Sequence, residues 1–399
     1  MNSNGLSPAR LAHMHDVLAH YVDRGDVPGV VTLLSRNGET HVDVIGTTAF
    51  GVSDPLRRDA IFRISSMTKP ITAVATLLLV EDGTLRLDDP VDGLLPELAD
   101  RTVLRRLDGP IDDTVPAKRP ITVRDLLTFR MGFGQMMVSP DGYPILQAAS
   151  AQQLGMGPPS PATMPAPAEW MRRLGALPLM HQPGETWMYN TAADVLGVLI
   201  ARAAGQPLET FLRERIFTPL GMDDTGFHVP AIARDRFVPS YWADGETEAL
   251  TLYDAADQTS QWSQPPAFPS GAGGLVSTID DYGAFGQLLL SKGQNGSTRI
   301  LSESSVTLMT TNQLTPQQRA GAGDFLGATR GWGFGVSIVM QPDAVVAVPG
   351  RFGWEGGLGT SWASDIQQGV VAILMTQVMG FPSGIYDDFW RAVYQTIDS

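Results

Sequence analysis

The chain has 399 residues and a mass of 42.9 kDa, a length that suits two domains or one domain with a large insertion. Charged residues make up 18% and hydrophobic residues 43%, a composition that excludes chain-wide intrinsic disorder. The formal net charge of -14 repels nucleic-acid phosphates and anionic lipids, and the lack of cysteine excludes thiol catalysis, disulfides and cysteine-ligated metals.

The first ten residues, MNSNGLSPAR, lack the basic and apolar regions of a secretory signal, which predicts a cytoplasmic location. The longest mainly apolar run, from Ala73 to Val80, is much shorter than the roughly 20 residues that cross a bilayer. This run predicts a buried core helix. We therefore expect neither a nucleic acid nor a membrane as a partner, and the oligomeric state stays open.

The chain opens with a predicted helix and two predicted strands. Ser7 and Pro8 are typical of a helix N-terminus, and apolar residues then recur at helical spacing as far as Val22. Asn37-Gly38 is a strong hairpin signal. The strands on its two sides are expected at 30–35 and 41–45.

Strand-like runs return near the C-terminus and lead into a last helix. Asp387 and Asp388 fall in the first turn of that helix, where the helix dipole favours acidic side chains. The strands are expected at 333–340, 345–348, 360–364 and 370–376, and the helix at 386–397.

The middle of the chain is mainly helical, with helices expected at 123–128, 192–204, 208–216 and 279–290. We predict an α/β plus all-α fold in which an antiparallel sheet is flanked by N- and C-terminal helices. Residues 1–66 and 285–399 form the α/β domain, and residues 67–284 form an inserted helical domain with the active site at the interface. Two irregular segments, 139–168 and 237–268, are typical of lids, binding loops or linkers.

Ser66 and Lys69 lie three residues apart where the long apolar helix begins, because Pro70 is tolerated only in a first helical turn. Side chains at this spacing share one helix face. Burial would lower the pKa of the amine and let it act as a base for the serine hydroxyl. The alternative is a plain N-cap serine beside a solvated lysine. Only three lysines occur in the whole chain, and Lys69 alone follows a serine at this spacing.

Other routes to nucleophilic or metal catalysis have little support in the sequence. No G-x-S-x-G motif occurs, which argues against an α/β-hydrolase. None of the six histidines has H-E-x-x-H spacing. We therefore expect no metal and no organic cofactor.

Several motifs along the chain together resemble the serine β-lactamase and penicillin-binding-protein superfamily, and within it the class C β-lactamase-like esterases called family VIII carboxylesterases. The resemblance runs from about residue 10 to the C-terminus in the order that this family uses, and it implies the architecture predicted above. The motifs are Ser66–Pro70, Leu126–Thr128, Pro183–Asn190, Pro219–Met222, Ser270–Leu275, Trp332–Gly335 and Trp354–Gly357.

The resemblance implies that Ser66 is the nucleophile and that Lys69 takes or shares its proton. It also implies that Tyr189 is a second, phenolate-like base that passes the proton to the leaving group, with Lys69 and Tyr189 each lowering the pKa of the other. The alternative for Tyr189 is a packed aromatic residue with a satisfied hydroxyl. The backbone N–H groups of Ser66 and Gly357 would form the oxyanion hole, although the glycines there also suit a tight turn between strands.

Two departures from the family pattern concern the substrate. Asn190 follows Tyr189 directly instead of standing two residues after it. Trp354 replaces the lysine that holds anionic substrates in β-lactamases, which favours neutral esters, although Arg351 could supply the missing cation. The residues expected to bind substrate are Trp354, Gly356 and Asn190.

The predicted activity is a serine carboxylesterase that cleaves small carboxylic esters through an acyl-Ser66 intermediate. A β-lactamase or D-amino-acid amidase or peptidase, an acyltransferase and a non-catalytic binding relative are the alternatives. The acyl pocket is expected to be lined by aromatic and sulfur residues of the unassigned loops, unless these residues belong to satellite core instead. They are Met136, Met137, Tyr241 and Trp242.

Overall fold

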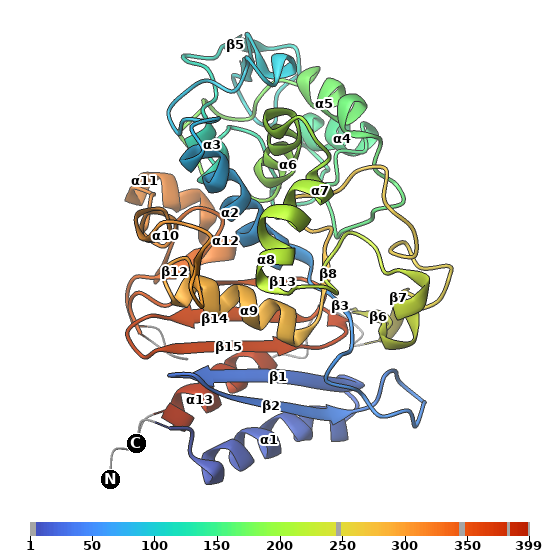
Figure 1. Ribbon diagram of the computed structural model, residues 1–399. Helices are drawn as coiled ribbons and strands as arrows, with labels where there is room; N and C mark the ends of the chain where they lie inside the picture. Colours follow the sequence, from blue (N-terminus) through green and yellow to red (C-terminus); the bar gives the residue numbers. More distant parts are fainter. Residues whose placement is uncertain (1–4, 245–248, 343–347, 381–383, 398–399) are drawn as a thin grey trace.

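The computed structural model describes residues 5–244, 249–342, 348–380 and 384–397. Its centre is a seven-stranded antiparallel sheet in the order β11-β12-β13-β14-β15-β1-β2 (Figure 1). Strand β1 pairs with β15, so that Val31 lies opposite Met375. Five neighbouring strands of the sheet therefore come from the C-terminal part of the chain and two from the N-terminal part. The strands are β1 Gly29–Arg36, β2 Glu39–Gly46, β11 Arg330–Trp332, β12 Ser337–Val339, β13 Phe352–Gly356, β14 Thr360–Asp365 and β15 Val370–Met375.

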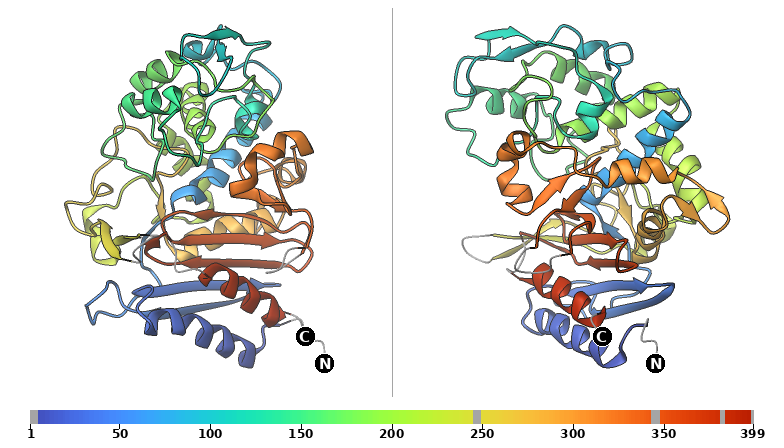
Figure 2. Two further views of the ribbon diagram at one scale, coloured as in Figure 1. Left: turned by 180° about the vertical axis from the view of Figure 1, so that it is seen from behind. Right: turned by 90° about the vertical axis from the view of Figure 1, so that its left-hand side faces the viewer.

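The first and last helices, α1 (Pro8–Asp23) and α13 (Ile385–Ile397), lie side by side on one face of this sheet (Figure 2). Their apolar residues recur at helical spacing, so each helix buries one stripe against the strands. The Tyr21 hydroxyl of α1 donates a hydrogen bond to Asp388 of α13 at 2.7 Å. The first and last helices are therefore held in one layer.

Helix α9 (Ile279–Leu290) covers the opposite face of the sheet, against β14, β15 and β1. Its rings of Tyr282 and Phe285 pack on Trp362 of β14. The helices of the middle of the chain lie beyond α9 (Figure 1). In their interior, α2 (Thr68–Glu81) packs against α6 (Thr191–Ala204). The site forms where α2 and α6 begin.

The remaining elements surround this pair or form small sheets at its edges. The helices are α3 Val123–Leu127, α4 Pro144–Ala151, α5 Pro167–Gly175, α7 Leu208–Leu212, α8 Thr218–Leu220, α10 Glu303–Met309, α11 Pro316–Arg319 and α12 Gly323–Leu326. The short strands are β3 Phe62–Arg63, β4 Thr102–Leu104, β5 Thr114–Pro116, β6 Ser240–Ala243, β7 Leu250–Asp254, β8 Val276–Ser277, β9 Gln294–Asn295, β10 Thr298–Arg299 and β16 Val378–Met379.

The predicted fold class is confirmed, including the hairpin at Asn37 and Gly38, where φ is 50° and 88°. The strand predicted at 333–340 is wrong in its first half, because residues 333–336 form the turn between β11 and β12, with Gly335 at φ 69°. The strand expected at 345–348 falls almost entirely outside the described residues. The predicted domain division stays a prediction, and its boundary after residue 284 lies inside α9.

Within the described ranges, no helix by itself has the length and apolar character needed to cross a membrane. Among the residues that the structure describes, only α6 taken together with the segment Leu208–Leu220 meets those criteria, and these two are bent by 81° relative to each other.

Candidate active site

Ser66 lies in a 3-10 turn, Ser65–Met67, that joins β3 to α2. Ser65 has φ 45°, in the left-handed region that non-glycine residues rarely adopt, so the chain turns sharply just before Ser66. The turn is fixed from outside, because the Tyr282 hydroxyl donates to the Met67 carbonyl at 2.8 Å. Ser66 itself is half-buried and borders a cavity. Helix α2 begins where Pro70 predicts.

The Lys69 side chain is only 1% exposed, so the alternative of a solvated charge is wrong. Its Nζ atom lies 2.8 Å from Ser66 Oγ and 2.7 Å from the carbonyl oxygen of Ala272. Burial lowers the pKa of Lys69, while the nearby charge of Asp194 opposes this shift. A buried amine of lowered pKa can hold its lone pair toward the serine hydroxyl, which is the arrangement that base catalysis requires.

Tyr189 reaches the same serine from the start of α6, and its hydroxyl lies 2.8 Å from Ser66 Oγ. The next residue, Asn190, has φ 78° and ψ -66°, and the Thr191 N–H donates back to the Tyr189 carbonyl at 3.2 Å. These values describe a strained γ-turn. Gln135 N–H also donates to that carbonyl at 2.9 Å. The backbone of Tyr189 is therefore fixed on both sides of the turn.

Trp354 of β13 contacts Tyr189 directly, because its Nε1–H donates to the tyrosine hydroxyl at 2.9 Å. Burial raises the pKa of Tyr189 to about 12, although its hydrogen bonds with Ser66 and Trp354 act to lower it. The prediction that the pKa of this tyrosine is lowered is therefore wrong. Desolvation outweighs the two hydrogen bonds, so Tyr189 retains its proton at neutral pH. Trp354 is a partner of Tyr189, a contact that the sequence did not reveal.

Strand β13 passes directly behind the serine turn at Gly356. A Cβ atom there would collide with the Ile64 carbonyl and the Thr360 hydroxyl, so this position requires glycine. At Gly357 an added Cβ would meet nothing within 4 Å. Gly356 also accepts a hydrogen bond from the Gly359 N–H at 3.0 Å, so the glycines form a tight turn between β13 and β14 as well. Gly357 borders the same cavity as Ser66, and their role as an oxyanion hole stays a prediction.

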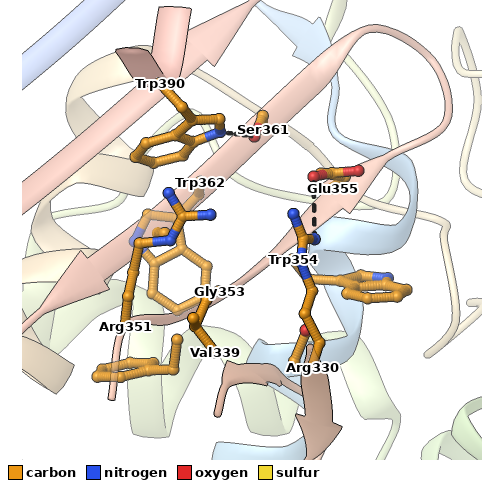
Figure 3. A pocket seen from close by; sticks show the side chains of 12 residues that line it. Arg330, Val339, Arg351, Gly353, Trp354, Glu355, Ser361, Trp362 and Trp390 are labelled. Atoms are coloured by element: carbon orange, nitrogen blue, oxygen red, sulfur yellow. Dashed lines mark hydrogen bonds and ion pairs between the residues drawn. The ribbon is translucent and has the colours of Figure 1, made fainter. Parts of the chain in front are cut away.

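Arg351 does not supply the missing cation, so that expectation is wrong. Successive residues of a strand point to opposite faces, and Arg351 and Trp354 are an odd number of positions apart. The Arg351 guanidinium lies 4.4 Å from the ring centre of Trp390 on α13, and the side chain is buried. Figure 3 shows it beneath that ring, with the indole of Trp354 pointing away from it. It therefore packs on the sheet face that lies away from Ser66.

A cavity of about 490 Å³ opens beside Ser66, Tyr189 and Asn190. Both irregular segments contribute to its wall, which fits the binding-loop alternative among the lids, binding loops or linkers predicted for them. The described residues that line it include the carboxyl group of Asp194 but no lysine or arginine. Much of the wall is apolar, formed by Met137, Met156, Pro158, Pro159, Met164, Trp242, Phe325 and Met379.

The four predicted pocket residues separate into three groups. Met137 and Trp242 line the large cavity. Met136 lines a neighbouring cavity of about 260 Å³ behind Tyr189. Tyr241 packs against Phe50, with ring centres 4.9 Å apart, so its assignment to the pocket is wrong. No cluster of three or more potential metal ligands occurs in the described part of the chain.

The Ser270–Leu275 motif passes between α2 and α6. A Cβ atom on Gly271 would lie 2.5 Å from the carbonyl oxygen of Ala193, so glycine is needed for the close approach. The Gly271 carbonyl accepts a hydrogen bond from Thr72 at 2.8 Å, and the next carbonyl, that of Ala272, accepts from Lys69. The sequence analysis identified this motif but did not predict that its Ala272 carbonyl accepts a hydrogen bond from Lys69.

Comparison with known proteins agrees with this geometry. A family model described as beta-lactamase matches residues 14–395, and the chain therefore belongs to this family. Protein Rv1367c of Mycobacterium tuberculosis (strain ATCC 25618 / H37Rv) is 38% identical over 365 residues, covering 89% of this chain and 87% of that protein. Esterase EstB of Burkholderia gladioli is 32% identical over 374 residues, covering 87% of this chain and 85% of EstB.

The fold also matches solved structures. The structure of EstCE1, described as a hydrolase with promiscuous acyltransferase activity, superposes with a TM-score of 0.80 at 23% identity. The match covers 97% of this chain and 98% of EstCE1. The resemblance to β-lactamase-like serine hydrolases that the motifs predicted is thus confirmed for family and fold.

Proposed function

We propose that this protein is a serine carboxylesterase that cleaves neutral esters through an acyl-Ser66 intermediate. The observation that carries the proposal is the position of Ser66 Oγ, 2.8 Å from both Lys69 Nζ and the Tyr189 hydroxyl oxygen. A serine hydroxyl is a weak nucleophile without a base, and this arrangement places a buried amine beside it. The relation to esterase EstB supports ester chemistry.

Acylation begins when Ser66 Oγ attacks the ester carbonyl carbon and its proton passes to the neutral amine of Lys69. The carbonyl oxygen becomes an oxyanion, which the N–H groups of Ser66 and Gly357 stabilise. The bond between carbonyl carbon and alcohol oxygen then breaks. Tyr189 gives its proton to the departing alcohol and regains one from Lys69. The high pKa of Tyr189 suits this role, because a protonated phenol is a donor from the outset.

Deacylation reverses these proton transfers. A water molecule attacks the acyl carbon and gives its proton to Tyr189, which passes its own proton to Lys69. The bond from the acyl carbon to Ser66 Oγ then breaks. The proton returns to Ser66, and the carboxylic acid leaves. No metal or organic cofactor takes part in this proposal.

The cavity supports a neutral substrate. No lysine or arginine is among its described lining residues, Trp354 replaces the expected lysine, and Arg351 faces the other side of the sheet. A substrate carboxylate would therefore lose its hydration on entering the cavity without forming an ion pair with a lysine or arginine there. The volume of about 490 Å³ falls within the range of pockets that hold drug-sized ligands, so the proposed substrates extend beyond short-chain esters.

Acyl transfer to an alcohol is the second candidate, because EstCE1 is described as a hydrolase with acyltransferase activity and the cavity has room for a second organic molecule. The two outcomes differ only in whether water or an alcohol attacks the acyl-enzyme. Turnover of p-nitrophenyl butyrate in rising concentrations of 1-butanol separates them. Butyl butyrate appears if transfer occurs, whereas butyrate alone appears if water is the only acceptor.

The decisive experiment is Ser66→Ala. We expect ester turnover to vanish and a fluorophosphonate probe to modify Ser66 of the parent protein but not the variant, as read by peptide mass spectrometry. Ser65→Gly is the matched control, since glycine accepts the left-handed backbone and leaves Ser66 in place. Turnover that survives in Ser66→Ala would overturn the proposal.

Amide chemistry is tested on the parent protein with three substrates. We expect p-nitrophenyl butyrate to be hydrolysed with a much higher kcat/KM than nitrocefin or a D-alanyl amide. A clear preference for the amides would mean that the replacement of lysine by Trp354 has been misinterpreted. The proposed partner is a small-molecule ester in the cytoplasm.

A further inference from the structure

Asp194 is a buried carboxyl group in the first turn of α6, 2% exposed, at the wall of the large cavity. Its Oδ1 atom accepts a hydrogen bond from the Ser270 hydroxyl at 2.6 Å and another from the Ala272 N–H at 3.1 Å. A buried carboxylate is destabilising unless it is hydrogen-bonded and paired with a charge. The mechanism described above does not use it, so its presence calls for a physical reason.

The segment that Asp194 holds is the one that holds Lys69. Ala272 donates its N–H to Asp194, and its carbonyl oxygen accepts from Lys69 Nζ at 2.7 Å. The Ser270 hydroxyl, bound to Asp194, also accepts from the Gly273 N–H at 3.1 Å and so closes the turn around Ala272. A continuous path of hydrogen bonds therefore runs from Asp194 through Ala272 to Lys69 and ends at Ser66.

The two buried groups also act on each other through space. Burial raises the pKa of Asp194, and the charge of Lys69 opposes that shift. Conversely, the charge of Asp194 opposes the fall in the pKa of Lys69 that burial causes. The carboxylate thus keeps the amine basic enough to accept a proton, since a base is most effective when its pKa lies near the working pH.

Other charged groups on the elements packed around α6 are engaged elsewhere. On α3, Arg124 pairs with Asp88 at 2.6 Å and Asp125 with Arg119 at 2.5 Å. The carboxylate of Glu209 on α7 and the guanidinium of Arg202 on α6 are likewise in other ion pairs. The group from α2 that acts on Asp194 is Lys69, and the phenol of Tyr189 lies at the start of the same helix as Asp194.

We propose that Asp194 is a positioning residue for Lys69: it holds the Ser270–Ala272 segment so that the Ala272 carbonyl aims the amine at Ser66, and its negative charge sets how readily that amine takes a proton. The inference rests on the proposed function of Ser66 and Lys69. It assigns two separable parts to Asp194, a hydrogen-bonding part and an electrostatic part.

Asp194→Asn separates them, because the amide oxygen can still accept from Ser270 and Ala272 while the charge is lost. The titration midpoint of Lys69 is measured by NMR on protein labelled with ¹³C at the lysine ε carbon. The chain has only three lysines, and Lys69→Met identifies the resonance. We expect the Lys69 midpoint to fall by about one pH unit in Asp194→Asn, with the acidic limb of kcat/KM moving in the same direction and the plateau falling about threefold.

Ser270→Ala tests the hydrogen-bonding part, since it removes one donor to Asp194 and leaves the charge. We expect the Lys69 midpoint to fall by less than in Asp194→Asn, because the Ser270 hydrogen bond only favours the charged form of a carboxyl group that is still present. We also expect about a tenfold lower kcat, with KM nearly constant, because the amine is misaligned. Ser270→Thr retains the hydroxyl and should recover most of the loss. This pair decides the positioning role even if Asp194→Asn does not fold, which thermal melting would reveal.

Two results would overturn the inference. One is a Lys69 midpoint in folded Asp194→Asn that equals the parental midpoint. The other is a kcat in Ser270→Ala that equals that of the parent. The NMR midpoint does not depend on ester turnover, so a failure of the proposed esterase activity, seen as turnover in Ser66→Ala, stays distinct from a failure of this inference.

Discussion

Helices α2 and α6 begin in the same way and yet are organised differently. Each has 14 residues, and just before each helix one residue has a positive φ, Ser65 before α2 and Asn190 before α6. In both cases this residue is adjacent to a reactive one, Ser66 or Tyr189. At α2 the two reactive groups, Ser66 and Lys69, belong to one turn of chain. At the start of α6 a single reactive group, Tyr189, depends on contacts from other segments, of which Trp354 is 165 positions away.

The difference shows which part of the site is local. The spacing of Ser66 and Lys69 follows from helix geometry alone, so any chain that starts a helix there brings them together. The place of Tyr189 depends on a strained turn, on β13 and on the packing of its ring against Phe325, with ring centres 4.3 Å apart. Changes near Tyr189 should therefore alter proton transfer while leaving the serine and lysine in place.

Tyr189→Phe should have the largest effect, because it removes the donor to the leaving group while the ring packing remains. We expect kcat for p-nitrophenyl butyrate to fall about 10³-fold, within the usual range for loss of a general acid–base group. Tyr241→Phe, whose ring packs on Phe50 away from the site, is the control and should match the parent. Equal kcat values for the two variants would show that the phenol is only a packed aromatic residue.

Gly356→Ala should have the next largest effect, this time on the α2 side. The added methyl group collides with the Ile64 carbonyl behind the serine turn, which should lower the free energy of unfolding by about 2 kcal/mol and reduce kcat/KM as well. Gly357→Ala, which meets nothing within 4 Å, should retain parental stability. Urea unfolding measures both, and a reversed ranking would contradict the account of this close approach.

Trp354→Phe should have the smallest effect of the three. It removes the Nε1–H donor to Tyr189 and so raises the pKa of the tyrosine further, because that hydrogen bond stabilises the phenolate. We expect kcat to fall about tenfold, the equivalent of one hydrogen bond. The matched variant Trp362→Phe, on the neighbouring strand directly opposite, should change stability and leave kcat intact. Similar kcat losses in both would assign the effect to packing.

Much of the fold followed from short patterns. The apolar periodicity of the terminal helices predicted α1 and α13 nearly to their ends. The reason is that the apolar residues of each amphipathic face are neighbours within a single stretch of sequence. The strand predicted at 333–340 was wrong because its alternating apolar residues continue through a turn, where Gly335 takes a positive φ. A turn of this kind depends on how β11 and β12 pair, and that pairing lies outside any local window.

The residues of the candidate site could be predicted from the sequence, but their pKa values and orientations could be predicted less well. Lys69 was expected to be buried and of lowered pKa, and both hold, because a helix that is apolar nearly all round must be enclosed. For Tyr189 the direction of the pKa shift was wrong, since it depends on how much water the surrounding rings exclude. Arg351 was near in sequence but lies on the opposite face of the sheet.

The sequence by itself determined that a serine and a lysine lie three residues apart where a buried helix begins, and that segments from both ends of the chain build one sheet. Hydrogen-bond geometry and apolar periodicity operate over a few residues, so they can be read from the order of amino acids. Only the tertiary structure decided that Trp354 donates to Tyr189, that Asp194 holds the segment beneath Lys69 and that Arg351 points elsewhere. Those contacts join segments far apart in the chain, and they depend on strand pairing and on burial, which no short stretch of sequence encodes.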